Sequence, residues 1–263
     1  MTSKPPSYSP SQPCRLSDVP QWEDTSDILI VGFGVAGACA ALEAAAAGAQ
    51  CTLFEMASAP GGSTVMSGGE FYFGGNGGTA VQRAHGYEDA TEDFYQYMMM
   101  AGGPGADAER VGLFANQALE HYEWLMAQGV PFKGTFHQER TVEPMTDDTL
   151  LWSGSEAAWP FCERAKPAPR GHAVQKKGKG AGKVLMEKLV EKIAAHENIV
   201  VKTDTRVIAL IVESAGDTEN SVSLPRVHGV VVRSAGIEQY YRANKGVILC
   251  AGGFVSNEDM LRR

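Results

Sequence analysis

The five cysteines of this 263-residue chain form no Cys-x-x-Cys pair. Their scattered positions are Cys14, Cys39, Cys51, Cys162 and Cys250. This spacing excludes the usual zinc, iron–sulfur and c-type haem motifs, so we expect no metal site. The chain also lacks the paired cysteines of a small secreted domain, which favours a reducing compartment. We therefore predict a cytoplasmic protein.

Positive charge and long apolar runs are scarce as well. The net charge of −8 argues against nucleic acid or an anionic membrane surface as the main partner. No apolar run reaches the length needed to span a bilayer. Residues 1–26 are rich in proline and serine and lack the apolar segment of a secretory signal. We expect them to form a disordered tail ahead of a domain that covers residues 27–263.

Two familiar motifs are present only in part. Residues 178–184 resemble a phosphate-binding P-loop, but Val184 replaces the hydroxyl residue that would bind magnesium, and the first glycine of the motif is missing. Gly154 and Ser155 lack the spacing of a nucleophile elbow. We therefore interpret residues 178–183 as a basic, mobile turn before a helix, and we assign no catalytic residue.

The most informative feature that is present is a glycine turn. An apolar run over residues 28–31 leads into Gly32-Phe33-Gly34-Val35-Ala36-Gly37, an alanine-rich helical pattern follows, and a second apolar run ends at Glu55. The order of strand, glycine turn, helix, strand and acid is the fingerprint of a dinucleotide site. The alternatives are a glycine turn that binds nothing and an NAD-dependent enzyme.

Each part of this fingerprint has an expected role. Gly32 permits the tight turn, Gly34 lets the backbone approach a pyrophosphate, and Gly37 lets the helix lie close to the strand. The helix N-terminus offers free N–H groups and a positive dipole end to the phosphates. Glu55 accepts a hydrogen bond from a ribose hydroxyl.

The remaining pattern predicts an α/β fold. Residues 56–80 combine many glycines with aromatic residues, which indicates backbone approach to a ligand rather than a linker. Helical periodicity predicts helices over 88–101, 107–128 and 183–195, and residues 130–181 are expected to be irregular. Strands are expected over 199–202, 206–212, 227–233, 237–242 and 246–250. They predict an antiparallel meander that returns to the main sheet, with 246–250 as a buried central strand.

Several segments together resemble the flavoprotein family of soluble fumarate reductases, succinate dehydrogenase flavoprotein subunits and 3-ketosteroid dehydrogenases. The similar segments are residues 31–37, 54–55, 61–64, 67–69, 203–207 and 246–254. The resemblance covers about residues 26–263. Residues 67–72, 152–156 and 169–172 are most similar to the 3-ketosteroid dehydrogenase branch.

The resemblance implies a Rossmann-like FAD-binding domain, with a parallel sheet, helices and a small antiparallel meander, and without a capping substrate domain. It implies FAD as the cofactor, bound noncovalently, because Gly62 stands where succinate dehydrogenases carry the histidine linked to the flavin. The implied cofactor-binding residues are Gly32, Gly34, Val35, Ala36, Gly37, Glu55, Met56, Gly61, Gly62, Ser63, Thr64, Ser67, Gly68, Gly69, Glu70, Val207, Ala251 and Gly252.

The chemistry implied by the family is hydride transfer between flavin N5 and a substrate carbon near a ketone or carboxyl group. The substrate is a small molecule, either a steroid-like ketone or a dicarboxylate, and the absence of a haem motif implies a separate electron acceptor.

The family's catalytic residues lie mostly in a part that this chain lacks. Tyr72 and His172 are the two polar residues of interest, but the favoured interpretation of both is packing and loop hydrogen bonding. The alternative is a truncated, non-catalytic fragment. Half of the domain that should cover the strand over 246–250 is absent, so we expect the isolated chain to be marginally stable, prone to associate and stabilised by FAD.

Overall fold

A computed structural model describes residues 12–213, 226–254 and 257–262. The chain divides into two compact units. Unit 1 combines Met1–Gly62 with Lys192–Arg263, and unit 2 is Ser63–Glu191. The single domain expected over residues 27–263 is therefore built from two compact parts, each with its own sheet.

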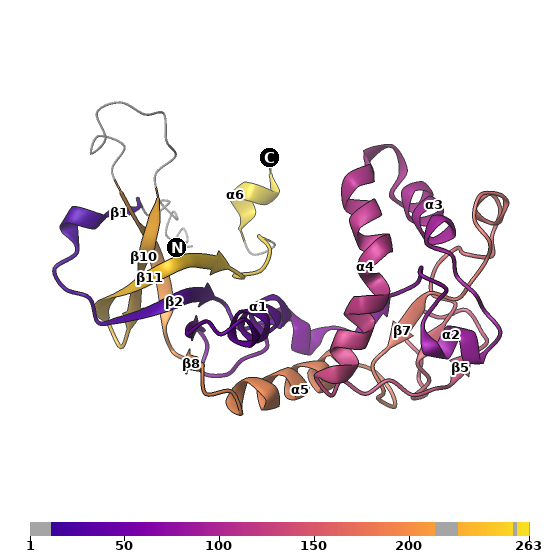
Figure 1. Ribbon diagram of the computed structural model, residues 1–263, viewed down its shortest axis with the longest axis horizontal. Helices are drawn as coiled ribbons and strands as arrows, with labels where there is room; N and C mark the ends of the chain where they lie inside the picture. Colours follow the sequence, from indigo (N-terminus) through magenta and orange to yellow (C-terminus); the bar gives the residue numbers. More distant parts are fainter. Residues whose placement is uncertain (1–11, 214–225, 255–256, 263) are drawn as a thin grey trace, which may run out of the picture. The chain divides into compact units, whose positions relative to one another are not determined.

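Unit 1 holds a seven-stranded sheet in the order β1-β9-β10-β11-β2-β3-β8. The elements of this unit are β1 (Cys14–Arg15), β2 (Asp24–Val31), α1 (Val35–Ala46), β3 (Cys51–Phe54), β8 (Ile199–Lys202), β9 (Arg206–Val212), β10 (Val227–Ser234), β11 (Ile237–Leu249) and α6 (Glu258–Leu261). Strands β11, β2, β3 and β8 run parallel, whereas β9, β10 and β11 form an antiparallel meander. Helix α1 packs beside β2 and β3 (Figure 1). This arrangement confirms the predicted α/β class.

The core of unit 1 joins the parallel strands to the meander. Leu29 on β2 and Phe54 on β3 pack with Val230, Val232 and Tyr241 from β10 and β11. The Phe54 and Tyr241 rings meet edge to face, with centroids 4.9 Å apart. Burying each of these side chains contributes about 1.5–3 kcal/mol, so the core fixes the parallel strands that end at the glycine turn.

The predicted disordered tail is wrong for residues 12–26. Strand β1 pairs in parallel with β9, and the Arg242 guanidinium lies 5.9 Å from the centroid of the Trp22 ring. Strand β2 already begins at Asp24, and the Glu23 N–H donates to the Tyr240 carbonyl over 2.8 Å. Proline and serine content concealed these pairings because they depend on strands some 200 residues later. Residues 1–11 lie outside the described part of the chain.

Two predicted strands are one. Residues 237–242 and 246–250 were expected as separate strands, but β11 continues from Ile237 to Leu249 across a register irregularity between Ala243 and Gly246. Its pairing with β10 ends at Arg242, and beyond that point β11 continues to pair with β2. Residues 246–249 pair with β2, and Leu249 is 62% exposed, as expected for a strand whose covering domain is half absent.

Unit 2 combines helices with a small four-stranded sheet in the order β4-β7-β6-β5. The elements of this unit are β4 (Glu70–Tyr72), α2 (Ala80–Ala84), α3 (Thr91–Gly102), α4 (Ala108–Ala127), β5 (Phe136–His137), β6 (Leu150–Leu151), β7 (Gly171–Ala173) and α5 (Gly182–Ala194), the last of which runs on into unit 1. Helices α3, α4 and α5 confirm the predicted helices within a few residues. Strands β5, β6 and β7 lie in the stretch expected to be irregular. They have only two or three residues each, too few to show a period.

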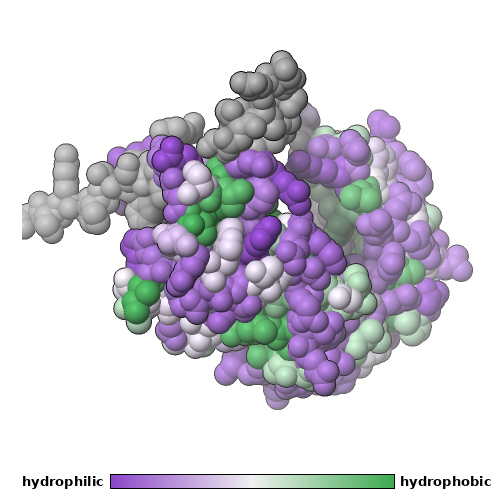
Figure 2. Space-filling model, turned by 60° about the vertical axis from the view of Figure 1, so that its left-hand side comes forward, coloured by the Kyte–Doolittle hydropathy of each residue, from purple (hydrophilic) through white to green (hydrophobic). Residues whose placement is uncertain are grey.

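The face drawn in Figure 2 is mostly hydrophilic, with small hydrophobic patches among the polar residues. None of the helices in the described ranges combines the length and the apolar character needed to cross a membrane.

Candidate functional site

The first glycine turn leaves no room for a side chain at Gly32. This residue follows β2 with φ of +100°, a backbone conformation that favours glycine. A Cβ atom added at Gly32 would lie 2.5 Å from the carbonyl oxygen of Cys250, at the end of β11. Both the local conformation and the tertiary contact therefore require glycine here, as the sequence predicted for a tight turn.

Helix α1 starts directly on this turn. Gly34 is its N-cap residue and provides no side-chain hydrogen bond. A Cβ atom at Gly37 would lie 1.9 Å from the Gly32 carbonyl oxygen, so the first turn of the helix packs on backbone. The positive end of the helix dipole is thereby held at the glycine turn, where an anion is favoured.

Glu55 closes the other side of the turn. Glu55 is 8% exposed. Its carboxylate accepts the Phe33 N–H through Oε2 and the Ala57 N–H through Oε1, each over 2.8 Å. A carboxylate has about four acceptor positions, so capacity remains for ribose hydroxyls. The acid of the fingerprint is thus tied to the glycine turn by a hydrogen bond.

The second glycine cluster begins against the first. The Gly61 N–H donates to the Phe33 carbonyl over 2.7 Å. Gly61 and Gly62 both have positive φ, and a Cβ atom at Gly62 would lie 3.7 Å from the Gly34 Cα atom. The start of the second glycine cluster therefore lies against the first, and the backbone of residues 32–37 and 61–62 forms the cradle of unit 1.

The other predicted positions of unit 1 differ in exposure. Val207 is partly buried against the core, whereas Met56 is exposed. Ala251 and Gly252 follow β11 and are exposed, and the Ala251 Cα atom would lie 3.2 Å from a Cβ atom at Gly32. The end of β11 therefore lies beside the glycine turn, and the predicted contact of Ala251 and Gly252 with the nucleotide stays a prediction.

The predicted positions from Ser63 to Glu70 belong to unit 2. The Ser67 hydroxyl donates to the Thr64 carbonyl over 2.8 Å, which tightens this loop. Gly182, the first residue of α5, donates its N–H to the Ser67 carbonyl, and a Cβ atom there would lie 2.0 Å from the Thr64 carbonyl oxygen. The interpretation of residues 178–183 as a mobile turn therefore missed this close packing at Gly182.

Glu70 lies at the end of the same loop. Its carboxylate folds over Gly68, where a Cβ atom would meet Glu70 Oε2 at 2.2 Å. Burial, followed by the nearby Glu143 charge, raises the pKa of the Glu70 carboxyl above its usual value. The Glu70 carboxylate therefore lies in the space that the absent side chain of Gly68 leaves.

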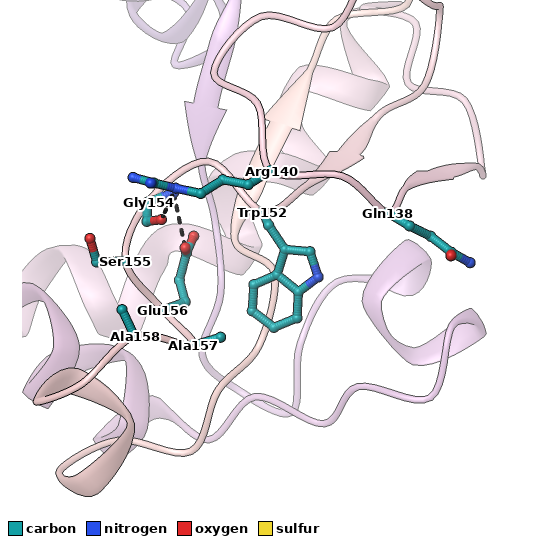
Figure 3. Close-up of a pocket in the computed structure, with 8 residues that line it drawn as sticks. All are labelled: Gln138, Arg140, Trp152, Gly154, Ser155, Glu156, Ala157 and Ala158. Carbon is teal, nitrogen blue, oxygen red and sulfur yellow. Dashed lines mark hydrogen bonds between the residues drawn. The ribbon is translucent and has the colours of Figure 1, made fainter.

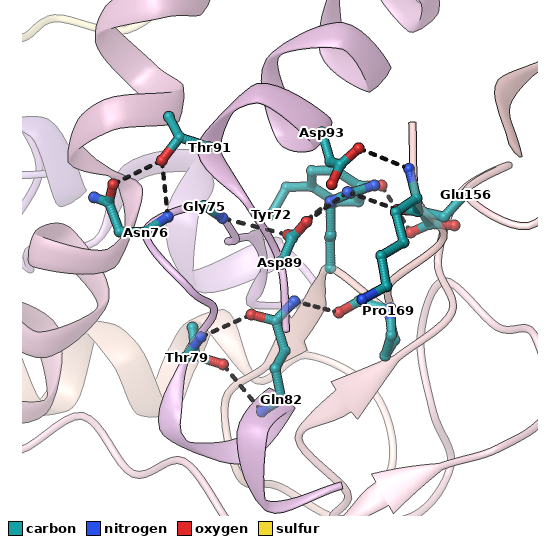
Figure 4. Close-up of polar contacts among 12 residues, drawn as sticks. Tyr72, Gly75, Asn76, Thr79, Gln82, Asp89, Thr91, Asp93, Glu156 and Pro169 are labelled. Carbon is teal, nitrogen blue, oxygen red and sulfur yellow. Dashed lines mark hydrogen bonds and ion pairs between the residues drawn. The ribbon is translucent and has the colours of Figure 1, made fainter. Parts of the chain in front are cut away.

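Tyr72 and His172 are both held by protein groups in unit 2. Tyr72 donates its hydroxyl to Glu156 Oε1 over 2.7 Å (Figure 4), and burial together with the Glu156 charge raises its pKa. His172 is fully buried, with Nδ1 2.9 Å from the Arg170 carbonyl and Nε2 2.9 Å from the Thr79 hydroxyl. A carbonyl only accepts, so Nδ1 carries the proton and Nε2 accepts from Thr79. These contacts support packing and loop hydrogen bonds for both residues.

Acid is expected to destabilise the chain through His172. Burial lowers its pKa from 6.5 to about 4, so between these values the unfolded state binds more protons than the folded state. The free energy of unfolding therefore falls as the pH drops through this window, by up to about 3 kcal/mol. Urea unfolding at several pH values between 7 and 4.5 measures the slope.

His172→Gln removes the titrating group and should flatten this dependence. His85→Gln is the matched control because His85 is exposed, and it should leave the slope unchanged. Equal slopes for wild type and His172→Gln would contradict the prediction.

Sequence reasoning missed a buried ion pair beside this network. Arg170 donates from Nε and Nη2 to the two carboxylate oxygens of Asp89, over 2.9 and 2.6 Å, and both side chains are 0% exposed. The guanidinium also lies over the Phe94 and Tyr97 rings, 5.5 and 5.2 Å from their centroids. The partners are far apart in sequence, so no spacing signals the pair.

Comparison with known proteins agrees with the cradle in unit 1. The sequence family described as "FAD binding domain" matches residues 27–262. The 3-oxo-5-alpha-steroid 4-dehydrogenase of Comamonas testosteroni is 33% identical over 183 residues, covering 68% of this chain and 34% of that protein. The probable fumarate reductase Ifc3 of Shewanella frigidimarina is 30% identical, covering 90% of this chain and 34% of that protein.

A solved structure extends this likeness to the fold. The 3-ketosteroid-delta4-(5alpha)-dehydrogenase of Rhodococcus jostii, solved with 4-androstene-3,17-dione, superposes with a TM-score of 0.87 at 40% identity. The match covers 96% of this chain and 51% of that one, so this chain spans about half the length of its solved relative. The chain belongs to the FAD-binding family that includes these steroid dehydrogenases and fumarate reductases, and its cofactor is FAD.

Proposed function

We propose that this chain is the flavin-binding part of an FAD-dependent oxidoreductase. The observation that carries the proposal is the backbone cradle of unit 1, where Gly32 and Gly37 let the N-terminus of α1 pack directly on the turn after β2 and Gly62 lies against Gly34. A pyrophosphate fits this arrangement, because the first-turn N–H groups of a helix and its positive dipole end favour phosphate oxygens.

Different residues of the chain would bind different parts of the cofactor. The turn from Gly32 to Gly37 would hold the pyrophosphate, and Glu55 the adenosine ribose through its remaining acceptor positions. Residues 61–70 would line the ribityl chain and the ring system, Val207 the adenine side, and Ala251 with Gly252 the nucleotide. Gly62 offers no side chain for a covalent bond, which supports noncovalent binding.

The bound flavin supplies hydride transfer at N5, to or from a carbon near a carbonyl group. A steroid-like ketone is the favoured substrate class, supported by 40% identity to the Rhodococcus jostii enzyme. A small dicarboxylate is the second candidate, supported by the relative named as a fumarate reductase. A separate electron acceptor would complete the cycle, and the five free thiols support a reducing, cytoplasmic setting.

A visible absorption spectrum of the purified chain, before and after FAD is added, tests the proposal. Twin flavin bands near ~375 and ~450 nm that persist on gel filtration and are released by acid are expected for a noncovalent site. A chain that stays colourless and ignores FAD would overturn it. Turnover of a steroid ketone or of fumarate by the flavin-loaded chain would then distinguish an active enzyme from a non-catalytic fragment.

Glu55→Ala is expected to weaken FAD binding by roughly ten- to a hundredfold. It removes both the ribose acceptor and the hydrogen bond that holds the Phe33 N–H, and a bond to a charged acceptor contributes about 1.5–3 kcal/mol. Quenching of FAD fluorescence during titration measures the dissociation constant. Glu120→Ala, at an exposed position of α4, should bind like wild type, and equal affinities for all three proteins would count against the assigned role.

A further inference from the structure

A second concave site lies wholly within unit 2. A cavity of about 320 Å³ opens between loop residues 138–140 and 152–158 (Figure 3). The Arg140 Nε donates to the Gly154 carbonyl over 2.8 Å, and the Thr141 N–H donates to the Trp152 carbonyl over 3.1 Å. These two bonds join the loops that form the walls, so the cavity is part of the folded unit.

One wall is a flat aromatic surface. Trp152 lines the cavity, and its ring also contacts two other aromatic rings. Tyr87 meets it edge-on at 89°, with centroids 5.6 Å apart, and Phe136 lies 6.5 Å from it. Neighbours of this kind fix the orientation of the indole, and a fixed ring face favours a planar aromatic ligand.

Arg140 places one positive charge on the same cavity. Its side chain is exposed and its Nε is occupied by Gly154. No ion pair of Arg140 occurs within residues 12–213, 226–254 and 257–262. A planar guanidinium with further N–H groups matches the geometry of a carboxylate.

Glu156 places one negative charge beneath the cavity. It lines the cavity although its residue is only 1% exposed. Its Oε2 accepts the Gly154 N–H over 2.9 Å and its Oε1 accepts the Tyr72 hydroxyl, so the carboxylate is fixed in place. A ligand carboxylate that pairs with Arg140 is compensated, whereas a second carboxylate would meet a fixed like charge.

We propose that this cavity binds a planar aromatic monocarboxylate, whose ring stacks on Trp152 and whose carboxylate pairs with Arg140. The ring supplies the apolar surface that matches Trp152, Ala157 and Ala158, and the single charge matches the single available guanidinium. The site lies in unit 2 alone, so its occupancy is measurable whether or not the chain binds flavin.

Isothermal titration calorimetry of the full chain with 2-naphthoate tests the site. Saturable binding is expected, and it should weaken about tenfold in Arg140→Gln, which removes a charge-assisted pair. Trp152→Leu should also weaken binding, whereas Trp152→Phe keeps an aromatic face and should retain most of it. The dicarboxylate 2,6-naphthalenedicarboxylate should bind more weakly than 2-naphthoate.

Arg164→Gln is the matched control, because Arg164 is an exposed arginine of the same unit outside the cavity. It should bind 2-naphthoate like wild type, and circular dichroism should show that every variant remains folded. Three results would each overturn the proposal: no binding by the wild-type chain at millimolar 2-naphthoate, equal affinity in Arg140→Gln, or equal loss in Arg164→Gln.

Discussion

Asp89→Ala is expected to lower the free energy of unfolding by about 3–5 kcal/mol, because it leaves the buried Arg170 guanidinium without its counter-ion. Both side chains are fully buried, and two hydrogen bonds join them. Burial by itself lowers the pKa of Arg170, but the hydrogen bond and the charge of Asp89 raise that pKa by more than burial lowers it. The guanidinium therefore remains charged. Asp89 also accepts the Gly75 N–H over 3.3 Å, and that donor would lose its partner too. Urea unfolding followed by tryptophan fluorescence measures the loss of stability.

A double variant separates the ion pair from the packing around it. Asp89→Leu with Arg170→Met removes both charges, and we expect it to recover most of the stability lost in Asp89→Ala. Asp147→Ala is the control for an exposed pair, since Lys133 and Asp147 bond over 2.8 Å but are about 40% exposed. Its expected cost is below about 1 kcal/mol. A cost for Asp89→Ala no larger than that of Asp147→Ala would refute the prediction.

The parts of the fold that the sequence predicted are those whose cause is local. The turn at Gly32 follows from a backbone angle, and helix α4 follows from apolar residues at helical spacing, of which Ala118, Tyr122 and Leu125 are buried. Gly129 follows the C-cap residue Gln128 of that helix with a φ of +87°, as a glycine after a helix end often does. Such features depend on residues within one or two turns of the chain.

The parts that the sequence did not predict depend on partners far away. The ion pair of Asp89 and Arg170 joins two loops, and the packing of Gly182 on Thr64 joins the start of α5 to the second glycine cluster. Strand β1 exists because β9 pairs with it, although its own two residues carry no strand pattern. Tertiary contacts of this kind leave no periodic signal in the sequence.

The candidate site shows the same division. The positions of Gly37 and Glu55 at the glycine turn were predicted from a known spacing, and the structure brings both there, while the binding of the ribose by Glu55 stays a prediction. The approach of Cys250 to Gly32 required the sheet order, because β11 reaches β2 only after the whole meander. Sequence therefore located the cradle, whereas the reason that Gly32 tolerates no side chain became visible only in the fold.

Gly37→Ala is expected to abolish measurable FAD binding and to lower the free energy of unfolding by about 1–3 kcal/mol, the usual cost of overpacking. Its Cβ atom would lie 1.9 Å from the Gly32 carbonyl oxygen, and both groups belong to backbone that no rotamer change can move. The first turn of α1 must therefore shift away from the glycine turn, which displaces the N–H groups that the phosphates would meet. FAD titration by fluorescence and urea unfolding without FAD measure the two effects separately.

Gly112→Ala is the matched control, because Gly112 is also a helical glycine and a Cβ atom there would meet only the Tyr95 ring edge, at 3.9 Å. Alanine is favoured over glycine in a helix by about 0.8–1.0 kcal/mol, so this variant should be as stable as wild type or more stable. It should bind FAD unchanged. Loss of FAD binding in Gly37→Ala at unaltered stability would indicate a role in ligand contact alone, whereas wild-type affinity in Gly37→Ala would show that the cradle of unit 1 does not hold the pyrophosphate.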